Sequence, residues 1–221
     1  MPVWGMAASS AIIDLRNLLA ERFPQPLTPP NLRLATGLPA LDELLGGGLP
    51  KSAITELSSP HVSAGTALLL YALLQNAHLA GYFLALVDGR DSFDPEPLGN
   101  SRLRNLLWIR CTKALDALKA ADLVLRDGNF PLVVLDLVLN DSVELRKIPQ
   151  TSWYRLQRLV EAAPTAFLVL TRESIISSAQ LKLSLDNAWT LADLEQNDLT
   201  SHLPILVKRA QGGREAIAGA S

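Results

Sequence analysis

Residues 36–57 read TGLPALDELLGGGLPKSAITEL, and this stretch decides the fold. It predicts a short helix, a stop at three consecutive glycines, a Leu-Pro turn and an apolar strand, AITEL. The loop SSPHVSAGT follows at residues 58–66 and leads into a second predicted helix, ALLLYALLQNAHLA, at residues 67–80. A strand, a loop and a helix in this order form the frame of a phosphate-binding site.

Strands and helices alternate along the rest of the chain. We expect strands at 82–88, 105–110, 131–136 and 165–171, helices at 113–126 and 151–163, and two weaker strands at 187–195 and 203–210. Apolar strands that alternate with such helices predict right-handed crossovers. The predicted fold class is therefore α/β, with a mostly parallel central sheet and helices on both faces.

The N-terminal residues 1–30 are predicted to stand apart from a core domain at 31–210, and 211–221 to form a flexible tail. SSAIIDLRNLLAERF, residues 9–23, is typical of an amphipathic helix. Its apolar residues form one stripe: Ile12, Leu15, Leu19 and Phe23. The next thirteen residues contain four prolines and form a linker. The helix either packs on its own domain or docks on a partner.

Composition limits the class of protein. The chain has 221 residues, enough for one substantial domain, and its single cysteine, Cys111, excludes a disulfide framework and a cysteine-cluster zinc site. No apolar run approaches the roughly 20 residues of a membrane span, and the first residues lack a signal-peptide pattern. We therefore expect a cytoplasmic protein without membrane contact, metal or other cofactor. A net charge of −2 gives no overall attraction to nucleic acid, so DNA contact would be indirect or weak.

The loop SSPHVSAGT has lost most of the phosphate-loop pattern G-x-x-x-x-G-K-[ST]. Alignment of the frame puts Ser59 at the first glycine, Ala64 at the second, Gly65 at the lysine and Thr66 at the hydroxyl. Only the hydroxyl remains. Loss of the lysine removes a charged contact worth about 1.5–3 kcal/mol. The helix N-terminus could still attract an anion, but hydrolysis of ATP is not expected.

Several segments, in order, resemble the core of the RecA recombinase. Residues 36–57 resemble the part that precedes and includes its phosphate-loop strand. VDGRDSFDP resembles the segment that carries the catalytic glutamate; Asp88 matches, but Arg90 stands at the glutamate. PLVVLDLV resembles the second acidic motif, with Asp136 at the magnesium-associated position. LVKRA resembles a strand that supplies two cations to a neighbouring subunit's nucleotide; Lys208 matches the first only.

This resemblance covers roughly residues 34–209 and implies a RecA-like P-loop NTPase core. The departures fall together on the loop lysine, both loop glycines, the glutamate and one cation, which implies a pseudo-ATPase rather than an enzyme. We expect 137–152 and 172–186 to be short connections where the recombinase has mobile DNA-binding loops.

Among degenerate relatives of this core, the chain looks most like the ImuA family of translesion DNA synthesis. That resemblance implies a non-catalytic accessory protein of the damage-inducible (SOS) response. Its implied partners are a Y-family-like protein and a C-family error-prone polymerase, with RecA a further candidate. One alternative is a SulA-like inhibitor of cell division that binds the tubulin-like division protein. Another is a RecA-like regulator that still binds nucleotide.

Two places are candidates for partner contact. The first is the apolar stripe of the N-terminal helix. The second is the helix beginning TSWYRLQRLV, which combines aromatic and arginine side chains of the kind enriched at interface hot spots: Trp153, Tyr154, Arg155 and Arg158. The alternative for Trp153 is that it packs in the core.

Overall fold

The computed structural model describes residues 33–61, 65–186 and 203–210. Their elements are, in chain order, β1 (Arg33–Leu34), α2 (Pro39–Leu44), β2 (Leu49–Pro50), β3 (Ala53–Ser58), α3 (Thr66–Ala80), β4 (Leu84–Asp88), η1 (Glu96–Leu98), α4 (Gly99–Leu103), β5 (Leu106–Arg110), α5 (Ala114–Asp127), β6 (Leu132–Asp136), α6 (Ser142–Arg146), α7 (Gln150–Glu161), β7 (Ala166–Thr171), β8 (Leu181–Leu185) and β9 (Ile205–Ala210). The three long predicted helices correspond to α3, α5 and α7.

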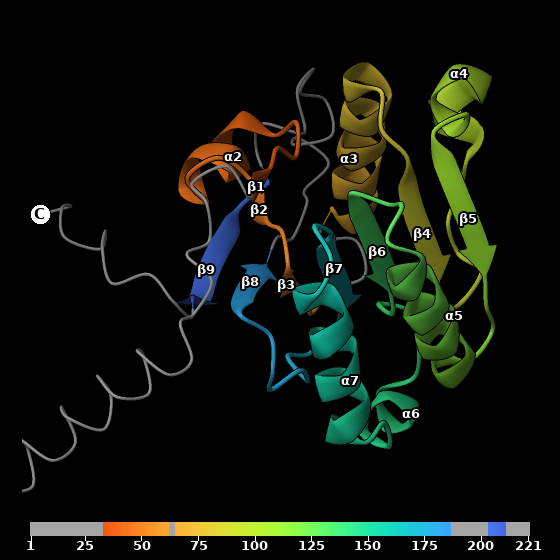
Figure 1. Ribbon diagram of the computed structural model, residues 1–221, viewed down its shortest axis with the longest axis vertical. Coiled ribbons are helices and arrows are strands. Elements are labelled where there is room, and N and C mark those ends of the chain that lie inside the picture. The colour runs from red at the N-terminus through yellow and green to blue at the C-terminus, as the bar shows by residue number, and fades with distance from the viewer. Residues whose placement is uncertain (1–32, 62–64, 187–202, 211–221) are drawn as a thin grey trace, which may run out of the picture. The chain divides into compact units, whose positions relative to one another are not determined.

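Within the described residues, seven strands form one sheet in the order β5-β4-β6-β7-β3-β8-β9 (Figure 1). Every neighbouring pair is parallel except β8 and β9, which run antiparallel. The short strands β1 and β2 form a separate antiparallel pair. The prediction of a mostly parallel α/β sheet is confirmed.

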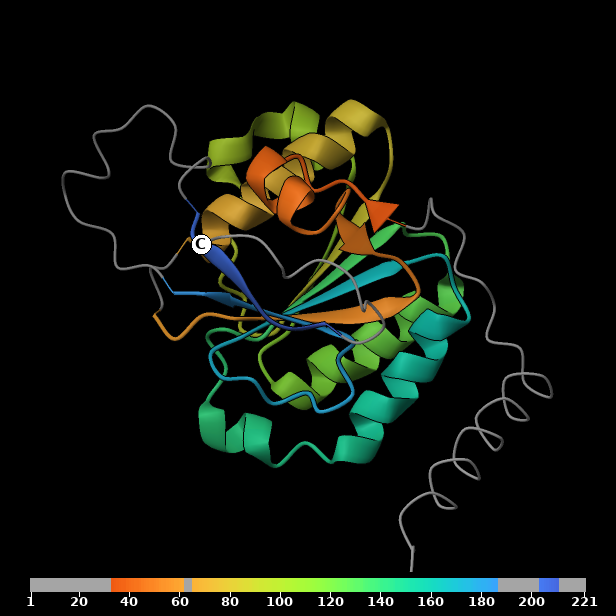
Figure 2. The same ribbon diagram turned by 90° about the vertical axis from the view of Figure 1, so that its left-hand side faces the viewer.

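Helices cover both faces of the sheet, as predicted. Figure 2 shows α2, α3 and α4 on one side and α5, α6 and α7 on the other. Successive residues of a strand point to opposite faces. In β4, Leu84 and Leu86 belong to the core beneath α3, whereas Ala85 and Val87 belong to the core beneath α5 and α7. None of the described helices is long and apolar enough to cross a membrane.

The three consecutive glycines allow β2 to lie beside β1. Gly48 has φ +114°, a conformation that side chains with a Cβ rarely adopt. A Cβ at this position would clash with the backbone oxygen of Leu34. Gly48 is therefore required both by its backbone conformation and by the close approach of the neighbouring strand.

The prediction that residues 172–186 form only a connection is wrong. Residues 181–185, LKLSL, form β8, which lies between β3 and β9. The leucines at 181, 183 and 185 enter the core beneath α3, and the alternation of apolar and polar residues was the available signal. The segment 137–152 also contains structure, because α6 begins there with the Asp141 side chain as its cap. The predicted strand 187–195, the N-terminal helix and the tail lie outside the described residues.

Candidate functional site: the carboxyl edge of the sheet

The carboxyl ends of β3, β4, β6 and β7 lie next to one another, since these strands are parallel and neighbouring. In open α/β sheets this edge is where ligands bind. Ser59 follows β3, and Asp88 and Asp136 are the last residues of β4 and β6. The structure therefore brings these three predicted site residues to one edge. Among the described residues, no cluster of His, Cys, Asp and Glu is arranged to hold a metal ion.

Ser59 closes a turn. Its side chain is fully buried, its N–H donates to the oxygen of Thr171 at 2.8 Å, and its hydroxyl donates to the oxygen of His61 at 3.0 Å. The first hydrogen bond keeps the start of the loop against the end of β7, and the second holds the turn within the loop. Ser59 thus serves the local backbone. Ala64 lies outside the described residues.

Gly65 stands where a phosphate loop has its lysine. It precedes the first residue of α3 and has φ +109°, ψ +14°, in the left-handed region. A lysine would be strained in this backbone conformation. The backbone conformation at position 65 therefore favours glycine. A lysine there would require the loop to adopt another backbone conformation. Thr66 begins α3 with only 9% of its surface exposed.

The carboxylate of Asp88 holds the turn that follows β4. It accepts hydrogen bonds from the N–H groups of Ser92 and Phe93, both at 2.8 Å, and from the indole of Trp108 at 3.4 Å. A further bond comes from the N–H of Arg90 at 3.2 Å. The residue is 1% exposed. Its oxygens are occupied by these donors, so the carboxylate has a structural role in this turn.

Arg90, at the position of the catalytic glutamate, is exposed at the same edge. Its guanidinium donates to the backbone oxygen of Thr112 at 3.2 Å and so ties the turn after β4 to the segment before α5. A guanidinium cannot accept a proton from water near neutral pH. The position therefore has no general base.

Asp136 differs from its neighbour Asp88. Its Oδ1 accepts one hydrogen bond, from the N–H of Val138 at 3.0 Å. Burial raises the pKa of Asp136 to about 6; the hydrogen bond from Val138 lowers it, and the charge of Asp88 raises it further. A carboxyl that is partly protonated near neutral pH is a weaker ligand for a cation than an ionised one.

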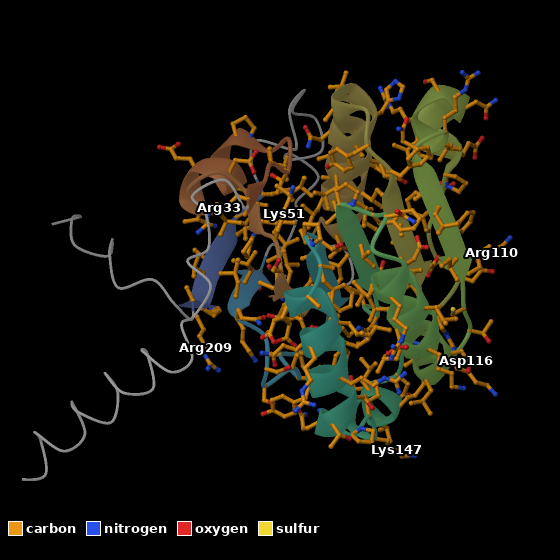
Figure 3. The ribbon with its side chains drawn as sticks, viewed as in Figure 1. Arg33, Lys51, Arg110, Asp116, Lys147 and Arg209 are labelled. Atoms are coloured by element: carbon orange, nitrogen blue, oxygen red, sulfur yellow. The ribbon has the colours of Figure 1, made fainter. Side chains whose placement is uncertain are left out.

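The remaining nucleotide-site residue, Lys208, is not brought to the carboxylates. It lies on β9, five strand positions from β4, which corresponds to roughly 24 Å at the usual strand spacing. In Figure 3 its neighbour Arg209 lies at the β9 edge and Arg110 at the opposite, β5 edge. Lys51 lies in the turn before β3, at the other end of that strand from Ser59. Within one copy of the chain, neither lysine therefore reaches the position of the missing one.

The structure corrects one residue of the second candidate partner surface, which is the helix beginning TSWYRLQRLV. Trp153 is 1% exposed and packs in the core beneath α5 and α7, so it is not accessible for contact. Tyr154, by contrast, is 50% exposed, and Arg158 is exposed as well. Arg155 is also exposed but is bonded to Asp122 of α5. The stripe of Ile12, Leu15, Leu19 and Phe23 lies outside the described residues.

Asp122 joins α5 to α7. Its carboxylate receives Arg126 at 2.7 Å and Arg155 at 2.9 Å. Burial raises the pKa of Asp122, but the hydrogen bonds from the two arginines outweigh that effect and leave the pKa below its ordinary value. The contact between Asp122 and Arg155 therefore holds α7 against α5.

Sequence reasoning missed a buried ionic network next to the loop strand. Glu56 of β3 is fully buried and accepts hydrogen bonds from the N–H groups of Ile175 and Ile176 at 2.6 and 3.0 Å. The Ser174 hydroxyl donates to it at 2.8 Å, and the Lys182 ammonium lies 3.0 Å away. The signal was one charged residue within an otherwise apolar strand. The network fastens the β7–β8 connection to the strand that leads into the loop.

Comparisons with known proteins agree with this fold. The chain is 37% identical to the RecA protein of Frankia alni over 113 residues, which cover 50% of this chain and 32% of the relative. It is 38% identical over 122 residues to the RecA protein of Clavibacter michiganensis (53% and 32%) and 38% identical over 109 residues to that of Streptomyces venezuelae (48% and 28%). The chain spans about a third of the length of these curated relatives. No family model matches it. The chain is therefore RecA-like in its fold and, over about half of its length, in its sequence.

Proposed function

We propose that this protein is a non-catalytic, RecA-like accessory protein of error-prone translesion DNA synthesis, similar to the ImuA family. It acts through protein contacts in the cytoplasm, with a Y-family-like protein and a C-family error-prone polymerase as its partners. In this proposal the nucleotide-site frame is retained because the sheet needs its strand and helix, and ATP is neither bound tightly nor split.

The conformation of Gly65 is the observation that supports the non-catalytic part of this proposal. At the position of the phosphate-loop lysine the chain has a glycine at φ +109°. The other nucleotide-site positions support the same reading. Asp88 is occupied by the turn that it holds, and Arg90 stands where a general base is needed. The lysine and the general base on which phosphoryl transfer depends are therefore absent, and one of the two carboxylates is committed to a turn.

The proposal is tested first by titrating the full chain with a fluorescent ATP analogue in the presence of Mg²⁺. We expect no saturation up to about millimolar analogue, which limits the binding free energy to about −4 kcal/mol. The variant Gly65→Lys, run beside it, should not restore binding because its backbone is strained. Micromolar binding by the natural chain would instead support a nucleotide-gated regulator.

A second experiment addresses the partners. The full chain, immobilised, is incubated with the purified Y-family-like protein and the C-family polymerase separately. Leu15→Asp combined with Leu19→Asp should abolish capture while leaving the thermal unfolding of the core unchanged. Failure of the natural chain to capture either protein contradicts the translesion role. Capture of the tubulin-like division protein instead would favour the SulA-like alternative.

A further inference from the structure

We draw no further inference here: the strongest candidate, the exposed surface patch of α5 and α7 with Leu123, Tyr154 and Arg158, carries nothing, because the acidic and basic residues of the two helices are equal in number and nothing in the part of the chain that the structure describes shows what covers it.

Discussion

Asp88 and Asp136 are register partners at the last positions of β4 and β6, and their surroundings give the two carboxylates different properties. Asp88 accepts several hydrogen bonds from the turn that it holds. Asp136 accepts one, and burial raises its pKa to about 6. One carboxylate of the pair therefore acts as a fixed part of a turn, and the other titrates near neutral pH.

The first prediction concerns the pH dependence of stability. The pKa of Asp136 is raised in the folded chain from an ordinary value of 3.8. Its contribution is therefore most favourable below about pH 4 and is lost as the pH rises through 6. Asp136→Asn keeps the acceptor for the Val138 N–H and removes the charge. It should increase the free energy of unfolding by about 1–3 kcal/mol at pH 8 and by almost nothing at pH 4. Urea unfolding at both pH values measures this, and an equal effect at the two would contradict it.

The second prediction concerns the buried pair of Glu56 and Lys182. Lys182→Met leaves a buried carboxylate without its counter-charge and should cost about 2–4 kcal/mol. The double variant Lys182→Met with Glu56→Gln should lose less free energy of unfolding than the sum of the two single losses. Both charges are removed in the double variant, so no unpaired charge stays buried. Arg146→Met is the control. Its pair with Glu173 is more than half exposed on both sides, so its loss should cost less than about 1 kcal/mol. If the loss of stability in the double variant equals the sum of the two single losses, the pair is not coupled.

The third prediction separates core from surface on α7. Trp153→Ala should destabilise the fold by about 3–5 kcal/mol, because the side chain is buried in the core. Tyr154→Ala, one position along the same helix, should change stability by less than about 0.5 kcal/mol. Chemical denaturation measures both. A partner that binds α7 should be lost with Tyr154→Ala although the protein stays folded.

The fourth prediction concerns two glycines of the triple-glycine turn. Gly48→Ala should cost roughly 3 kcal/mol or more, since the added Cβ would meet the backbone at Leu34 and the residue would be strained. Gly46 also has a positive φ, +64°, but a Cβ there meets nothing within 4 Å. Gly46→Ala should therefore cost only about 1 kcal/mol, the price of the left-handed conformation. If both variants lose the same stability, the close approach of β1 is not the reason for Gly48.

The sequence was most informative where the physics is local. The periodicity of α3, α5 and α7 and the apolar runs of β4, β6 and β7 come from neighbouring residues, so their pattern predicted the fold class. The order of strands was not predicted, because it depends on contacts between distant segments. β8 was not predicted for the same reason. Its alternating sequence, LKLSL, forms a strand because it pairs with β3, which lies far earlier in the chain.

The candidate site shows the same difference between local features, which could be predicted, and long-range contacts, which could not. The residue types at Gly65 and Arg90 could be read from the alignment of motifs. What Asp88 and Ser59 do could not, because their hydrogen bonds go to a turn and to β7, respectively. Trp153 shows why a partner surface is hard to predict from sequence. An aromatic residue on an amphipathic helix suits either the core or an interface, and only its burial in the structure distinguishes the two.

The position of β3 in the sheet has a consequence for how the protein is made. β3 is paired on one side by β7 and on the other by β8, and the contact between Ile54 and Gln180 joins residues 126 positions apart. The ribosome therefore makes this interior strand long before either of its neighbours exists. During this interval β3 has neither of its partner strands, and α3 or a chaperone can cover its apolar side chains. Chains released before β7 should accordingly aggregate rather than accumulate as a half-formed domain.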